Sequence, residues 1–137
     1  MTLPLRVHGL LLLLAGAVAC TTAVPPQTHV LGLLDPDLDR LLYVTTNAER
    51  ENVIADLELA GFATTIDARE TPLVLVVKLG SPRGRKTCGS LRNVIYQLRN
   101  GGVVAAVIKG RGWTGSCDPS ILREMNAALA HLFDARM

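Results

Sequence analysis

The apolar and polar positions divide the chain into an apolar start, a short polar stretch and a longer region of mixed periods. Residues Gly9 to Ala19 are all apolar or small, and the stretch at 21–29 has no regular spacing. From residue 30 onward, two kinds of segment follow one another. In some, apolar and polar residues alternate, as is typical of strands, and in others apolar residues recur every three to four positions, as is typical of helices. This division predicts one folded domain over residues 30–137, because that length supports a single core.

Seven elements are predicted within that domain. Val53, Ile54, Leu57 and Ala60 recur at helical spacing, with Gly61 as the end signal. The expected elements are a strand at 38–46, a helix opened by Asn47, strands at 63–68 and 72–79, a strand pair at 91–99 and 103–111, and a helix from Asp118-Pro119 to Phe133. The run at 72–79 is apolar at successive positions, which predicts a central strand.

The segment 91–99 fits either a helix or a strand. We favour a strand because Val94, Tyr96 and Leu98 alternate and Asn100-Gly101 is a strong hairpin signal. The order of elements is then β-α-β-β-β-β-α. It predicts an α+β fold with a four- to five-stranded, mostly antiparallel sheet and two helices on one face.

The apolar start is too short to span a bilayer. It covers about 13 residues, from Val7 to Ala19, where a spanning helix needs roughly 18 to 20. Arg6 precedes it and small residues end it, as in a secretory signal. Ala17-Val18-Ala19-Cys20 resembles the lipobox of bacterial lipoproteins, although Ala17 stands where that motif usually has Leu.

This resemblance implies a signal peptide at 1–19 and acyl chains such as palmitate on Cys20, with residues 20–29 as a lipid-anchored tether. Two or more acyl chains give a stable membrane anchor. Thr21, rather than Asp, after the cysteine implies the periplasmic side of the outer membrane. The alternative is plain secretion after cleavage by an ordinary signal peptidase.

The chain has three cysteines, an odd number that needs an explanation in an exported protein. If Cys20 carries lipid, Cys88 and Cys117 remain as a pair. In the oxidising periplasm this pair is expected to form a disulfide. Counting outward from the hairpin turn places Cys88 near residues 113–114, within reach of Cys117. The alternative is two buried thiols in a protein that stays in the cytoplasm.

Charge is unevenly distributed along the chain. Residues 30–70 hold nine acidic and three basic residues, whereas residues 71–117 hold eight basic and no acidic ones. Either the two regions neutralise each other, or the basic region faces an anion. For the second alternative the candidate anion-binding residues are Arg83, Arg85, Lys86, Arg92, Lys109 and Arg111. In a cell envelope the anions would be lipopolysaccharide, lipid phosphates or wall polymers, and nucleic acid is not expected.

No pattern predicts catalysis, a metal or a cofactor. The histidines, cysteines and acidic residues lack the spacing of a metal site. Residues 110–115 match G-x-G-x-x-G, but the chain ends without the further strand and acidic residue of a dinucleotide site. We therefore expect no enzymatic activity.

The order of elements resembles that of small envelope-assembly lipoproteins, such as the lipopolysaccharide-transport lipoprotein LptE. This resemblance is one of fold alone. The leading hypothesis is a membrane-anchored accessory lipoprotein that binds a protein partner in an envelope assembly or transport complex. The alternative is a module that binds an anionic envelope ligand through the basic hairpin.

Overall fold

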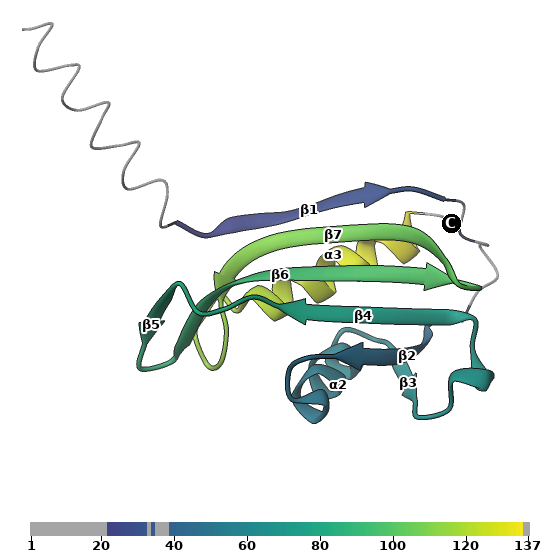
Figure 1. Ribbon diagram of the computed structural model, residues 1–137, viewed down its shortest axis with the longest axis horizontal. Helices are drawn as coiled ribbons and strands as arrows, with labels where there is room; N and C mark the ends of the chain where they lie inside the picture. Colours follow the sequence, from purple (N-terminus) through teal and green to yellow (C-terminus); the bar gives the residue numbers. More distant parts are fainter. Residues whose placement is uncertain (1–21, 33, 35–38, 136–137) are drawn as a thin grey trace, which may run out of the picture.

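The computed structural model describes residues 22–32, 34 and 39–135. The predicted signal segment and Cys20 lie outside these residues. The described part is an open, mixed sheet with two helices, which confirms the α+β class (Figure 1). The strands are β1 (Val24–Val30), β2 (Leu41–Thr46), β3 (Ala63–Thr65), β4 (Leu73–Leu79), β5 (Gly84–Lys86), β6 (Gly89–Asn100) and β7 (Val103–Trp113). The helices are α2 (Arg50–Leu59) and α3 (Ile121–Asp134), with a short 3-10 turn, η1, at Ala68–Glu70.

The sheet has the strand order β1-β7-β6-β4-β2-β3, with β5 paired to β6. β4 is central, as predicted, and runs parallel to β2 and antiparallel to β6. The strand alternative for 91–99 is confirmed, because β6 and β7 form a long antiparallel hairpin. Gly101 and Gly102 at its turn have φ of +58° and +84°, a conformation that favours glycine.

Two strands were not expected from the sequence, so the sheet has more strands than the four to five predicted. Residues 24–29, expected as tether, form most of β1, and the expected loop before Cys88 contains β5. β1 was not predicted because it contains Pro25 and Pro26, and proline has no backbone N–H to donate to a neighbouring strand. β1 is tolerated as an edge strand, and its register with β7 shifts between Val24 and Gln27, where the prolines stand.

Both helices begin later than predicted. Asn47 does not cap α2, which starts after Glu49. Its side chain bridges to the end of β4 instead: Nδ2 donates to the carbonyl of Leu79 at 3.0 Å, and the Leu79 amide donates to Oδ1 at 2.9 Å. Similarly, Ser120 rather than Asp118 precedes α3. In both cases the polar residue belongs to the loop that leads into the helix.

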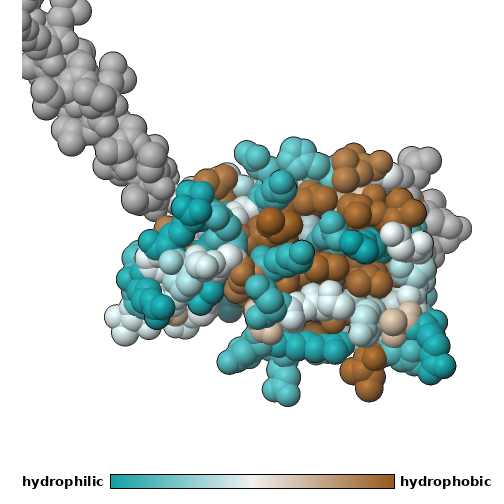
Figure 2. Space-filling view, viewed as in Figure 1, coloured by the Kyte–Doolittle hydropathy of each residue, from teal (hydrophilic) through white to brown (hydrophobic). Residues whose placement is uncertain are grey.

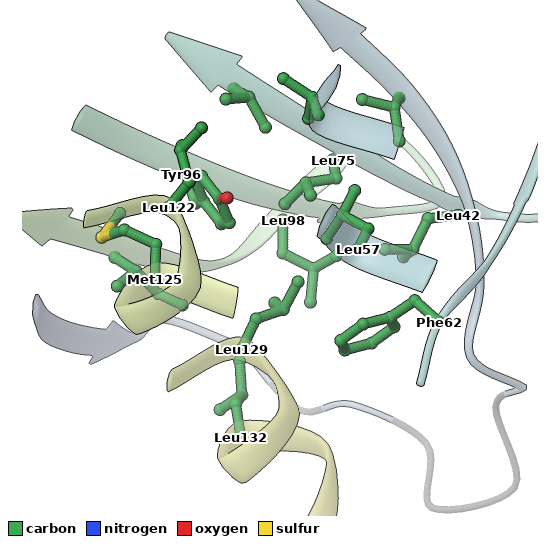
Figure 3. Packing of buried hydrophobic residues seen from close by; sticks show 14 of the residues in the cluster. Leu42, Leu57, Phe62, Leu75, Tyr96, Leu98, Leu122, Met125, Leu129 and Leu132 are labelled. Atoms are coloured by element: carbon green, nitrogen blue, oxygen red, sulfur yellow. The ribbon is translucent and has the colours of Figure 1, made fainter. Parts of the chain in front are cut away.

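The core lies between one face of the sheet and the two helices (Figure 3). Leu42, Leu75 and Leu98 on the strands meet Leu57 of α2 and Leu129 of α3, all with 1% or less of their surface exposed. A polar contact crosses this core, where the Tyr96 hydroxyl donates to Oδ1 of Asn126 at 2.5 Å. Burial raises the pKa of Tyr96 well above its ordinary value, with a smaller contribution from the charge of Asp56.

Two glycines of β7 allow α3 to approach the sheet. A Cβ on Gly112 would lie 2.8 Å from the Cβ of Ile121, and one on Gly110 would lie 3.2 Å from Met125 Sδ. These are the first two glycines of the G-x-G-x-x-G match. Their place beneath α3 gives them a packing role that the sequence did not predict.

Candidate functional site

The face of the sheet opposite the helices is the candidate site, and we call it the open face. Residues paired across strands point to the same side of a sheet, and alternate residues point to opposite sides. The pairs Lys78–Ile95 and Ile95–Lys109 therefore lie on the open face, as do Val76–Gln97 and Gln97–Val107. No described helix packs on this side. Figure 2 shows brown side chains gathered over β7, β6 and β4 on this face, with teal side chains among them.

Cations gather at one end of the open face, where β1 begins. Lys78 and Lys109 flank Ile95, and Arg111 lies opposite Val24, the first residue of β1. Lys86 of β5 lies with its Nζ 4.3 Å from the ring centroid of Trp113. We call Lys78, Lys86, Lys109 and Arg111 the basic end. The three lysines are exposed and Arg111 is half-buried, with its Nε donating to Asn93 Oδ1 at 2.7 Å.

Apolar residues gather at the other end of the same strands. On the open face Val74, Val76, Val104 and Val107 are half-buried. At the end of β1 Leu31 is 65% exposed. Arg99, also on the open face, lies between Val74 and Val104, with which it is paired. We call the four valines and Leu31 the apolar end. The open face is thus divided along the strands into a basic end and an apolar end.

Among the residues that the structure describes, no ion pair includes a basic residue of 71–117. The ion pairs of the described residues join Arg40 to Asp134 and Arg69 to Asp67, and neither includes a residue of that region. The acidic helix α2 buries Val53 and Leu57 in the core, so it covers the face opposite the basic end. Of the two alternatives for the charge asymmetry, the geometry favours a basic surface that faces solvent or a ligand.

The six predicted anion-binding residues do not form one cluster. Lys86, Lys109 and Arg111 belong to the basic end. Arg92 points to the helix side, opposite Gly112, and donates from Nη1 to the Gly80 carbonyl at 3.0 Å. Arg85 pairs with Ser90 on that same side, and Arg83 is exposed in the loop before β5. Lys78 was not among the predicted residues, and it joins the basic end through the pairing of β4 with β6.

The disulfide predicted from the cysteine count is present between Cys88 and Cys117, with Cα atoms 4.9 Å apart. It holds the loop after β7 against the β5–β6 turn. Two close backbone approaches reinforce this contact, because a Cβ on Gly89 would lie 1.9 Å from the Thr114 carbonyl oxygen and one on Gly115 would lie 2.3 Å from that of Cys88. The bridge thus fixes Lys86 and Trp113 relative to each other.

A second surface feature is an open cavity of about 780 Å³ beside the start of α2. Asn52, Asp56, Arg92 and Thr114 contribute polar groups to its lining. The Thr114 hydroxyl is already engaged with the Ser90 carbonyl at 3.0 Å. The lining contains neither histidine nor cysteine.

Two further properties concern only the residues that the structure describes. They contain no cluster of three histidine, cysteine or acidic side chains able to hold a metal ion. Among the described helices, none combines the length and apolar character needed to cross a bilayer.

No known protein family and no curated protein matches the sequence. Several solved structures match parts of the fold. PelC from Paraburkholderia phytofirmans, a dodecamer, aligns with 82% of this chain and 95% of its own at 14% identity and a TM-score of 0.48. A DUF4136 family protein from Bacteroides thetaiotaomicron covers the same shares at 11% identity and a TM-score of 0.47. A minor lipoprotein from Acinetobacter baumannii aligns with 71% of this chain and 92% of its own at 11% identity and a TM-score of 0.35. These likenesses are of fold alone, and no residue role is taken from them.

Proposed function

We propose that the chain is an accessory lipoprotein of the bacterial cell envelope, anchored through Cys20 and acting by binding rather than by catalysis. Through its apolar end it binds a protein partner in an envelope assembly or transport complex. The exposure of the apolar end is the observation that carries this proposal. Large apolar side chains gathered in one exposed area are typical of protein interaction sites.

Two further features support an exported, anchored protein. The disulfide between Cys88 and Cys117 suits an oxidising compartment. The odd third cysteine, Cys20, stands directly after the apolar segment, where a lipoprotein carries its acyl chains. We place the protein on the periplasmic side of the outer membrane, because Thr21 follows the cysteine.

The anchor is tested by the intact mass of the mature protein isolated from membranes. The proposal expects a chain that begins at Cys20 and carries the mass of its acyl chains. A mature form that begins at Cys20 without added lipid would contradict the proposed lipid anchor.

The partner is tested by site-specific photo-crosslinking in intact cells. A crosslinker at Val104, in the apolar end, is expected to give one discrete adduct with another protein, which Leu31→Asp abolishes. The matched control is a crosslinker at Leu59, which is 81% exposed on α2 and is expected to give none. Adducts of equal yield from both positions, or none from Val104, would contradict partner binding at the apolar end.

A further inference from the structure

Strand β1 limits the distance between the folded domain and Cys20. β1 begins at Val24, so only residues 20–23 remain as tether. An extended chain spans at most about 3.6 Å per residue, or about 14 Å over this length. A lipid on Cys20 therefore brings the start of β1 to the headgroup layer of the membrane.

The start of β1 lies beside the basic end. Val24 is paired with Arg111, and Gln27, the next paired residue of β1, lies opposite Lys109. Ile95 of β6 lies opposite Lys109, and Lys78 of β4 lies opposite Ile95. Lys78, Lys86 and Lys109 are also the only lysines in the sequence. The proposed anchor and the basic end thus share one end of the sheet.

We infer that the basic end docks on an anionic phospholipid bilayer, so that the domain lies against the membrane to which Cys20 holds it. This inference rests on the proposed function, since it takes the acyl anchor as given. A cation interacts with a charged surface over about 8 Å at physiological salt, and the short tether holds the basic end close to that range. Each Lys or Arg near an anionic leaflet strengthens binding about fivefold.

Charge complementarity favours this occupant over a second copy of the chain. Two copies that met through their basic ends would bring like charges together, which opposes association. A bilayer supplies lipid phosphates over a wide area and needs no shape match. Docking at the basic end leaves the apolar end, at the other end of the strands, accessible to a partner.

The test uses residues 20–137 with Cys20→Ser, which carry no lipid, so that the domain's own affinity is measured. Sedimentation with vesicles compares phosphatidylcholine alone with an equimolar mixture of phosphatidylcholine and phosphatidylglycerol. The inference expects binding to the mixed vesicles only, and this binding should weaken as salt is raised.

Two double variants with the same loss of charge separate docking from general attraction. Lys78→Gln with Lys109→Gln removes exposed cations of the basic end and is expected to weaken binding at least about tenfold. Arg99→Gln with Arg123→Gln removes exposed cations outside it and is expected to weaken binding less than about threefold. Circular dichroism is the check that both variants remain folded.

Equal losses in the two variants, or equal binding to phosphatidylcholine alone, would overturn the docking. If the domain bound a soluble acidic protein but did not bind vesicles, the docking on a bilayer would be overturned in favour of a protein ligand at the basic end. These outcomes concern the domain only. A mature protein without acyl chains would instead remove the proposed anchor, whatever the unlipidated domain binds.

Discussion

Val24 of β1 lies opposite Arg111 of β7, so the first strand of the domain starts beside the cations of the open face. If Cys20 carries the proposed lipid, the short tether makes position along the strands a position relative to the membrane. The basic end is then membrane-proximal and the apolar end membrane-distal.

At a salt concentration at which the unlipidated domain no longer binds anionic vesicles, lengthening the tether should release the basic end, because the tether alone then holds it at the bilayer. Inserting ten Gly and Ser residues between Ala23 and Val24 adds a flexible span of about 17 Å root-mean-square length. In acylated protein on anionic vesicles, labelling of Lys78 and Lys109 by a water-soluble amine reagent should then increase several-fold, as read by mass spectrometry. The same insertion between Gly101 and Gly102, at the hairpin turn, is the control and should leave the labelling unchanged. Unchanged labelling in the tether variant would argue against a domain held at the surface.

Removing the disulfide should destabilise the fold without changing its topology. The bridge closes a separation of 29 residues, for which the loop-entropy relation gives about 3 to 4 kcal/mol. Cys88→Ser with Cys117→Ser should lower the free energy of unfolding in urea by that amount. A decrease in unfolding free energy below about 1 kcal/mol would mean that the loop is held without the disulfide, by the close backbone contacts at Gly89 and Gly115 and by the β6–β7 hairpin.

Gly112→Ala should separate α3 from the sheet. The added Cβ would lie 2.8 Å from the Cβ of Ile121. That Cβ is attached to the helix backbone, so a change of side-chain rotamer cannot move it away. Overpacking of this kind costs about 1 to 3 kcal/mol. Gly32→Ala is the matched control, because its Cβ would meet only ordinary contacts, the nearest at 3.7 Å. Thermal unfolding should show a clear decrease for the first variant and little change for the second.

Tyr96→Phe should leave Asn126 without its hydroxyl donor in the core. Asn126 is 2% exposed, and an unsatisfied buried polar group costs about 1 to 3 kcal/mol. Burial raises the pKa of Tyr96 in the folded state above its ordinary value of 10.0. The stability contributed by this residue is therefore full below pH 10 and decreases as pH rises above it. The difference in unfolding free energy between the two proteins should shrink above pH 10, and an unchanged difference would contradict a buried neutral phenol.

Elements with a strong local signal could be predicted from the sequence. The alternation of Val94, Tyr96 and Leu98 before Asn100-Gly101 gave the β6–β7 hairpin, and the apolar run gave the central strand β4. β1 could not be found this way. Its prolines contradict strand propensity, and only pairing with β7 makes the segment a strand. β5 is three residues long and likewise depends on β6.

The candidate site was predictable only in part. The excess of cations in 71–117 was visible in the sequence, but their division between the two sides of the sheet depends on register. Arg92 and Arg111 illustrate this, since they lie on neighbouring strands of one hairpin and point to opposite sides. Lys78 joins the basic end through the pairing of β4 with β6, a contact between segments that no local pattern specifies.

Quenching of Trp113 fluorescence tests the membrane-anchored arrangement most directly. Trp113 is the only tryptophan in the chain, and it contacts Lys86 at the basic end. Acylated mature protein is placed in anionic vesicles whose lipids carry a nitroxide on the headgroup. The account predicts strong quenching that is relieved by Lys78→Gln with Lys109→Gln and unaffected by Arg99→Gln with Arg123→Gln. Fluorescence equal to that in vesicles without nitroxide would show that the basic end does not face the bilayer.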